Sequence, residues 1–291
     1  MTANRADPIA RRSAILRRFY ARYVAARAGV TDSRVIAAFA AVPREAFAGP
    51  GPWSVLAIGP WSDTGRYVRT PDADPAFLYH DTLIALDAAR GINIGEPSLH
   101  ARCLDALAIR LGETALQVGA GSGYYTAILA ELVGPGGRVH GYEIDPALAA
   151  RATANLADRP WVSLHAGSGV ADGLPQADIV YVNAGLTQPS RAWLDALRPG
   201  GRLLFPLQPL DGYGAMLLVR RPKAGGTWPA RFICRAGFIA CQARQDAATG
   251  RRLAIAFAGG DWTQVRSLRL DDAPDATNWC SGDGWWLSTD P

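Results

Sequence analysis

A glycine-rich turn between two apolar segments constrains the fold of this chain more than any other feature. Residues 114–134, TALQVGAGSGYYTAILAELVG, follow a pattern that predicts a strand, a tight turn and a helix. Gly119, Gly121 and Gly123 supply the turn. Because glycine lacks a Cβ atom, the backbone can pass close to a ligand there, and the first amides of the helix can donate to polar ligand atoms. The turn alone is weak evidence for any one ligand, since dinucleotide enzymes use a similar one.

Strands and helices continue to alternate after the turn. The segment GRVHGYEID predicts a strand, followed by a helix that begins at Pro146 and that Asp145 is placed to cap. Further strands are expected at 161–165, 177–185 and 201–207, with a helix around 189–197. This alternation predicts an α/β fold with a doubly wound, mostly parallel sheet of the Rossmann-like type. The segments AMLLVRR and ARFICRAGFIACQAR predict an antiparallel hairpin at the sheet edge.

The regions around this core divide the chain into four predicted parts. Residues 1–48 are expected to form N-terminal helices broken at Gly29, with Thr31 or Asp32 capping the second. Residues 49–98 are an insert and covering segment, in which 49–75 has the character of a long loop or a small irregular insert. Residues 99–245 form the core. Residues 246–291 form a Trp-rich C-terminal extension, whose Trp279, Trp285 and Trp286 either line a pocket or, the favoured interpretation, hold the extension on the core.

Composition excludes several functional classes. The formal net charge is +4 and no run of five or more basic residues occurs, which disfavours a nucleic-acid partner. No apolar stretch is long enough to predict a membrane span. The four cysteines have neither zinc-site spacing nor a disulfide pattern, so we expect no metal, reduced thiols and a cytoplasmic location. The sequence makes no prediction about oligomeric state.

Two further features indicate the ligand. Glu143 lies at the end of the second strand, about twenty residues past the turn, where a carboxylate can bind two ribose hydroxyls. A charge at the N-terminus of the next helix is the alternative role for Glu143, although Asp145 could fill it equally well. The turn carries Ser122 and lacks the third glycine of dinucleotide sites, which favours S-adenosylmethionine over NAD. Asn183 follows the fourth strand, at the sheet edge where such folds bind ligands.

Three segments carry a family resemblance. They are AGVTDSRVIAAFAAVPREAF, LYHDTLIALDAARGINIGEPSLHARCLDAL and LRPGGRLLFPL, and together with the glycine turn they resemble the protein-L-isoaspartate O-methyltransferases over about residues 29–243. The resemblance implies a class I methyltransferase that uses S-adenosylmethionine. Its implied cofactor-binding residues are Ile94, His100, Gly119, Ala120, Gly121, Ser122, Gly123, Glu143, Ile144, Ser168, Gly169 and Asn183. Within this set the glycine turn would hold the methionine part, Glu143 the ribose, and Ser168 with Gly169 the adenine edge.

The chain departs from this family at the strip thought to contact both cofactor and substrate. The family strip is Thr-Ile-Ser, with the serine assigned to the active site, whereas this chain has Asn93, Ile94 and Gly95. Gln117 and Ser168 replace family acids, which suggests altered cofactor affinity. Asn93 and Gly95, with His80 and Asp81, are the catalytic candidates; His80 and Asp81 could equally cap the element that follows them.

Methyl transfer needs alignment more than proton transfer when the acceptor is a carboxylate. The main hypothesis is therefore an S-adenosylmethionine-dependent O-methyltransferase acting on a carboxylate in a protein, a peptide or a small acid. The alternative hypothesis is an inactive cofactor-binding module. A third hypothesis is a nicotinamide-dependent oxidoreductase. Nucleobase amine methylation is disfavoured because Asn183 is followed by Ala-Gly-Leu rather than by Pro-Pro and an aromatic residue.

Overall fold

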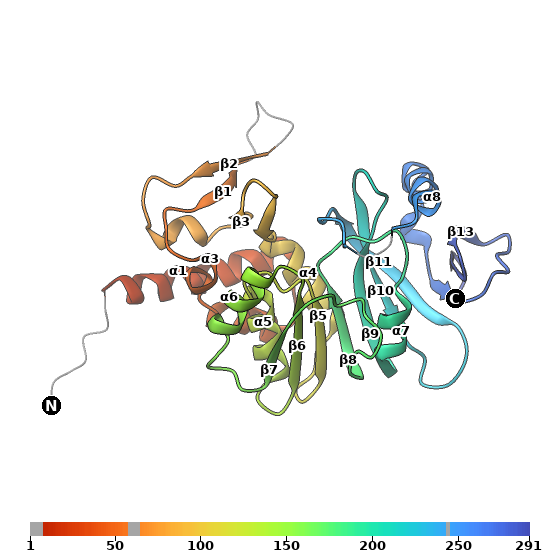
Figure 1. Ribbon diagram of the computed structural model, residues 1–291, viewed down its shortest axis with the longest axis horizontal. Helices are drawn as coiled ribbons and strands as arrows, with labels where there is room; N and C mark the ends of the chain where they lie inside the picture. Colours follow the sequence, from red (N-terminus) through yellow and green to blue (C-terminus); the bar gives the residue numbers. More distant parts are fainter. Residues whose placement is uncertain (1–7, 58–64, 243–244) are drawn as a thin grey trace.

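The computed structural model describes residues 8–57, 65–242 and 245–291 (Figure 1). The described residues do not include 1–7, 58–64 and 243–244, so the parts of the predicted segments that fall there lie outside them. The main sheet has a parallel half in the spatial order β7-β6-β5-β8-β9. Its strands are β5 (Thr114–Val118), β6 (Arg138–Glu143), β7 (Val162–Ala166), β8 (Ala177–Val182) and β9 (Leu197–Leu207). The order reverses between β5 and β8, so their carboxyl ends open a crevice for a ligand.

An antiparallel half continues the same sheet beyond β9. It contains the hairpin of β10 (Gly214–Arg220) and β11 (Trp228–Ala236), followed by β12 (Ser267–Arg269), β14 (Trp285–Ser288) and β13 (Asn278–Gly282). The C-terminal extension therefore adds strands to the main sheet, at the blue end of the chain in Figure 1.

Apolar cores cover both faces of the parallel strands. Successive strand residues point to opposite faces, and Ala115 packs in one core while Leu116 packs in the other. The first core is built with α1 (Pro8–Ala28), α2 (Ser33–Ala41), α3 (Arg44–Ala48), α4 (Pro97–Leu107) and α5 (Tyr124–Val133), with α6 (Pro146–Asn155) at its margin. The second is built with α7 (Arg191–Ala196) and α8 (Ala247–Ala258). Short 3-10 turns occur at Pro75–Leu78 and Trp262–Gln264.

A separate antiparallel sheet is built from the 49–98 segment. It comprises β1 (Ser54–Ala57), β2 (Arg66–Arg69), β3 (Ile84–Asp87) and β4 (Ile92–Ile94), in the order β2-β1-β3-β4. Arg44 fixes the chain just before β3, because its buried guanidinium donates to the carbonyl oxygens of Leu78, His80 and Thr82. The edge strand β4 carries Asn93 and Ile94, so this sheet presents the predicted acceptor strip.

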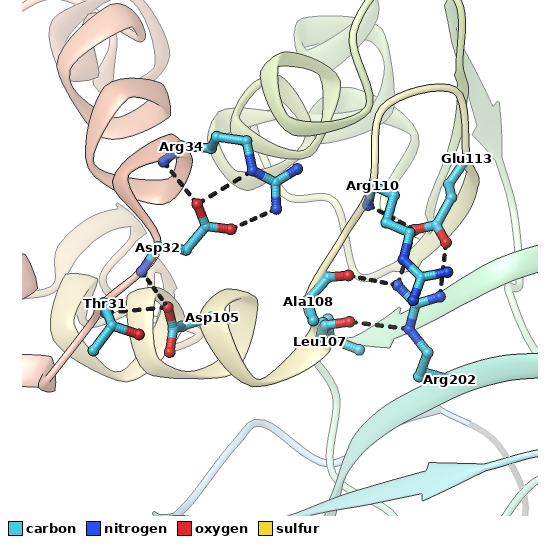
Figure 2. A network of polar contacts seen from close by, with 9 residues as sticks. All are labelled: Thr31, Asp32, Arg34, Asp105, Leu107, Ala108, Arg110, Glu113 and Arg202. Carbon is cyan, nitrogen blue, oxygen red and sulfur yellow. Dashed lines mark hydrogen bonds and ion pairs between the residues drawn. The ribbon is translucent and has the colours of Figure 1, made fainter.

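A polar network joins the helices to the main sheet (Figure 2). Arg202 on β9 donates to the carbonyl oxygens of Leu107 and Ala108 and makes two hydrogen bonds of 2.8 and 2.9 Å with the Glu113 carboxylate. These bonds satisfy carbonyls at the C-terminal end of α4, where Ala108 has a left-handed conformation with φ +48°. At the other side of α4, the Asp105 carboxylate accepts from the amides of the loop that leads into α2.

The fold class predicted from the sequence is confirmed, as is the antiparallel hairpin. Asp32 and Asp145 cap α2 and α6 as expected. The N-terminal segment holds three helices rather than two, since Pro43 interrupts the second predicted helix and starts α3. The interpretation of 49–75 as an irregular insert was wrong, because β1 and β2 lie within it.

The tryptophans of the extension are buried or half-buried against the sheet. Trp279 packs on Phe232 and Phe257, with ring centroids 5.3 and 5.1 Å away. Trp286 donates to the Asp271 carboxylate, and Trp285 lines a second cavity of about 700 Å³ beside α7. The packing of Trp279 on Phe232 and Phe257 agrees with the favoured interpretation, that the tryptophans hold the extension on the core, and a pocket role stays a prediction. Within the described residues, none of the helices combines the length and the apolar character needed to cross a membrane.

Candidate active site

A cavity of about 770 Å³ opens at the carboxyl ends of β5, β6 and β8. One wall is formed by the glycine turn, by Glu143 and Asp145, and by the loop that follows β7. The opposite wall is formed by β4 and the residues after it, and by residues 235–242. This volume and mixed lining are typical of a site for a ligand the size of a nucleoside derivative. The cavity contains both the predicted cofactor wall and the predicted acceptor strip.

The glycine turn has backbone conformations that L side chains rarely adopt. Gly119, Gly121 and Gly123 have φ values of +78°, +58° and +94°. A Cβ atom on Gly119 would lie 3.2 Å from the carbonyl oxygen of Asn183, and one on Gly123 would lie 2.9 Å from the side chain of Leu156. The turn therefore stays open to the cavity, with Gly123 at the start of α5, and its shape fits a polar ligand held by backbone amides.

Glu143 is held on the cavity wall by backbone donors. Its carboxylate accepts from the amide of Gly121 at 2.7 Å and from that of Asp145 at 3.0 Å. The alternative role as a helix charge falls to Asp145, whose carboxylate accepts from Ala147 and Leu148 at the start of α6. Arg90 also pairs with Asp145 at 2.7 Å. Because a carboxylate offers about four acceptor positions, Glu143 retains acceptor capacity for hydroxyls in the cavity.

The loop after β7 closes the far end of the cofactor wall. Ser168, Gly169 and Tyr142 line the cavity there, and the Tyr142 ring stacks on His165 at 4.7 Å. Gly169 packs so closely that a Cβ atom would lie 2.8 Å from Val118. An apolar slot beside a serine and an aromatic ring suits a flat heterocycle.

His100 is a buried polar side chain of the cavity wall, held between aromatic residues. Its Nδ1 lies 2.6 Å from the Tyr181 hydroxyl, and its ring stacks on Tyr125 with centroids 3.5 Å apart. The Tyr125 hydroxyl donates to the carbonyl oxygen of Gly95 at 2.7 Å. Burial, with a smaller contribution from the Arg44 charge, lowers the pKa of His100 to about 3, so the imidazole is neutral near neutral pH.

A family model described as protein-L-isoaspartate(D-aspartate) O-methyltransferase matches residues 22–231. The chain belongs to this family. A protein-L-isoaspartate O-methyltransferase 2 of Anaeromyxobacter sp. (strain Fw109-5) is 34% identical over 246 residues, covering 79% of this chain and 88% of that protein. A relative of the same description from Rhodopseudomonas palustris (strain BisB5) is 31% identical over 199 residues, covering 67% of this chain and 79% of the relative.

Solved structures show the same fold. A protein-L-isoaspartate O-methyltransferase aligns with a TM-score of 0.62 at 18% identity, covering 94% of this chain and 88% of its own. A putative one from Plasmodium falciparum, in complex with S-adenosyl-L-homocysteine, aligns with a TM-score of 0.60 at 18% identity, covering 78% of this chain and 99% of its own. Family membership confirms the resemblance seen in the sequence. The chain is thus an S-adenosylmethionine-dependent methyltransferase.

The cavity brings together most of the site residues predicted from the sequence. Those that line it are Asn93, Ile94, Gly95, His100, Gly119, Ala120, Gly121, Ser122, Glu143, Ile144, Ser168, Gly169 and Asn183. Gly123 lies directly behind the turn. Gln117, at the position of a family acid, does not line the cavity, since its side-chain oxygen accepts from Thr126 inside the core.

His80 and Asp81 do not line the cavity. The Asp81 carboxylate accepts from the amide of Ser98 at 2.8 Å and pairs with Arg27 at 2.7 Å, so it holds the first turn of α4. The carbonyl oxygen of His80 accepts from Arg44, and its ring is exposed. This placement outside the cavity lining disfavours a catalytic role for both residues, which stays a prediction.

Sequence reasoning missed several cavity residues. Tyr125 directly follows the glycine turn, where an aromatic pair was a visible signal. Tyr213 and Ile239 come from a loop and from a segment that folds back beside Gly185, and no local pattern marks them. Among the described residues, no group of three His, Cys, Asp or Glu side chains is placed to hold a metal ion.

Proposed function

We propose that this methyltransferase transfers the methyl group of S-adenosylmethionine to the free carboxylate of an isoaspartyl residue in a protein or peptide. One observation carries the proposal: a single cavity joins the glycine turn and Glu143 to the strip of Asn93, Ile94 and Gly95. The family relatives named for this activity support the choice of acceptor.

We assign the cofactor contacts along one wall. The amides of Gly119 to Gly123 would bind the methionine part, Glu143 the ribose hydroxyls, and Ser168 with Gly169 the adenine edge. Asn183, at the end of β8, lines the wall between them. The bound cofactor supplies a methyl group already activated by its sulfonium sulfur.

The acceptor would enter on the opposite side. Leu56, Leu83 and Leu86 line one side of the opening, and Tyr213 and Ile239, which are 68% and 51% exposed, line the other. Exposed apolar side chains around a cavity mouth are typical of a surface that binds a partner. They suit a peptide segment whose carboxylate reaches inward to Gly95.

The protein's chemical task is alignment. A carboxylate oxygen attacks the methyl carbon, the bond from carbon to sulfur breaks, and the electron pair stays on sulfur; no proton moves. The chain therefore needs no general base for this acceptor, which agrees with the position of His80 and Asp81 outside the cavity. The alternative of an inactive binding module is not favoured, because relatives that cover most of the chain are named as enzymes.

We also propose a cytoplasmic location, supported by four cysteines that form no disulfide.

An acceptor panel tests the proposal. Wild-type protein is incubated with S-adenosylmethionine labelled in the methyl group and with an isoaspartyl peptide, its normal aspartyl isomer, or small dicarboxylic acids. We expect base-labile label on the isoaspartyl peptide and little on its isomer. Label on a small acid alone would replace the proposed acceptor, and label on none would revive the inactive module.

A further inference from the structure

The space of the missing family serine is filled by His100. A Cβ atom built on Gly95 would lie 2.3 Å from Nε2 of His100 and 3.0 Å from its Cδ2. No side chain can therefore occupy position 95 while the imidazole keeps its place. In this chain the imidazole of His100 therefore occupies the space that a side chain at position 95 would need.

The imidazole is fixed from three sides. Tyr181 binds Nδ1, the Tyr125 ring stacks on one face, and Phe238 lies edge-on at 6.1 Å. The His100 side chain is only 2% exposed and still lines the cavity. No described residue makes a hydrogen bond with Nε2, so this nitrogen is left to face the open side of Gly95.

The hydrogen-bond chain behind the ring decides which nitrogen carries the proton. Burial raises the pKa of Tyr181, whose hydroxyl stays protonated between His100 and Cys103. When the hydroxyl, 2.6 Å from Nδ1, donates to this nitrogen rather than to the weakly accepting Cys103 sulfur, the ring accepts at Nδ1. The single proton of the neutral ring then lies on Nε2.

We infer that Nε2 of His100 donates a hydrogen bond to the acceptor carboxylate, in the place of the serine hydroxyl that the family uses. This rests on the proposed function. A neutral donor holds the carboxylate without cancelling its negative charge, so the oxygen remains a nucleophile. The His100 contact aligns the acceptor and takes no part in proton transfer, as the balance of the reaction requires.

Five variants, among them His100→Ala as a reference, test the inference on the isoaspartyl peptide. His100→Leu should lower kcat/KM by roughly 10- to 100-fold, the loss expected for a hydrogen bond to a charged group. His100→Gln keeps a donor near the position of Nε2 and should retain more activity than His100→Leu. Gly95→Ser alone should lose activity, because its Cβ meets the imidazole. The double variant Gly95→Ser with His100→Ala frees that space and supplies a hydroxyl, so it should exceed His100→Ala.

The melting temperature and the adenosylhomocysteine affinity are measured for each variant, and kcat/KM for the peptide is compared at saturating S-adenosylmethionine, so that a change in cofactor binding is separated from a change in acceptor binding. A merely structural histidine would give a double variant no better than His100→Ala, and that result overturns the inference. A Gly95→Ser variant as active as wild type would show that the imidazole does not block position 95, and it overturns the inference as well.

The tautomer of His100 provides a readout that needs no acceptor. Nitrogen-15 NMR of the wild-type protein with adenosylhomocysteine should show the proton on Nε2. A proton on Nδ1 overturns the inference even if the enzyme is active. An inactive wild-type protein with the proton on Nε2 refutes the proposed function instead.

Discussion

Replacing Glu143 by Gln changes one atom of the proposed ribose site and is the sharpest test of the cofactor wall. The carboxylate now accepts from two backbone amides, at 2.7 Å from Gly121 and 3.0 Å from Asp145. The amide of Gln has one acceptor oxygen, so one of these bonds is lost, together with the negative charge that would bind the ribose hydroxyls.

The expected loss is worked from these contacts. Hydrogen bonds to a charged group contribute about 1.5–3 kcal/mol, so the adenosylhomocysteine Kd should rise roughly 10- to 150-fold. A buried backbone amide left without its acceptor should also lower the free energy of unfolding by about 1–3 kcal/mol. Isothermal titration calorimetry at a temperature where the variant is folded separates the first effect from the second, and urea unfolding measures the second.

Glu131→Gln is the matched control. Glu131 lies on α5, outside the cavity, and pairs with Arg159 at 3.1 Å on the surface. The Glu131 side chain is 34% exposed, and Arg159 keeps Asp158 as a second partner, so the loss of this pair should cost about 1 kcal/mol or less and leave the affinity nearly unchanged. A Glu143→Gln variant that binds adenosylhomocysteine as tightly as the Glu131→Gln control would refute the ribose assignment.

Three further predictions concern stability. Arg202→Gln leaves the partly buried Glu113 carboxylate without its ion pair, with the Arg110 amide as its remaining donor, and should cost about 3–5 kcal/mol in urea unfolding. Arg198→Gln, from the more exposed pair with Asp178, should cost less than about 1 kcal/mol; equal costs would contradict the network of Figure 2. Ala108→Gly removes a Cβ atom from a residue with left-handed backbone, so it should raise the free energy of unfolding by about 1 kcal/mol and raise the melting temperature; a lower melting temperature would contradict this. Burial lowers the pKa of His100 from 6.5 to about 3. Between pH 6.5 and pH 3 the unfolded chain therefore binds one proton more than the folded protein at this residue. Stability should therefore fall as the pH drops through this window, by at most about 1.4 kcal/mol per pH unit, and His100→Gln should flatten the slope; an unchanged slope would place the imidazole outside the core.

The sequence predicted those parts of the site that follow from local geometry. The turn of Gly119, Gly121 and Gly123 needs positive φ, and Glu143 lies at the end of the neighbouring strand, so both positions followed from spacing along parallel strands. The caps at Asp32 and Asp145 followed from side chains that satisfy free helix amides.

Long-range contacts could not be predicted in this way. The strands β1 and β2 are four residues long and show no clear alternation of burial, so the small sheet left no periodic signal. Asp81 was chosen for its residue type, yet its partners Arg27 and Ser98 are far away in the chain. The short distance between His100 and the Cβ position of Gly95 is a contact between residues five apart in the chain, and no local sequence pattern marks it.

Mass spectrometry of an isoaspartyl peptide after incubation with wild-type protein and S-adenosylmethionine tests the central claim most directly. The account predicts a gain of one methyl group on the isoaspartyl residue, lost on mild base treatment, and an unmodified aspartyl isomer in the same tube. An isoaspartyl peptide that stays unmodified while the protein binds adenosylhomocysteine would contradict it.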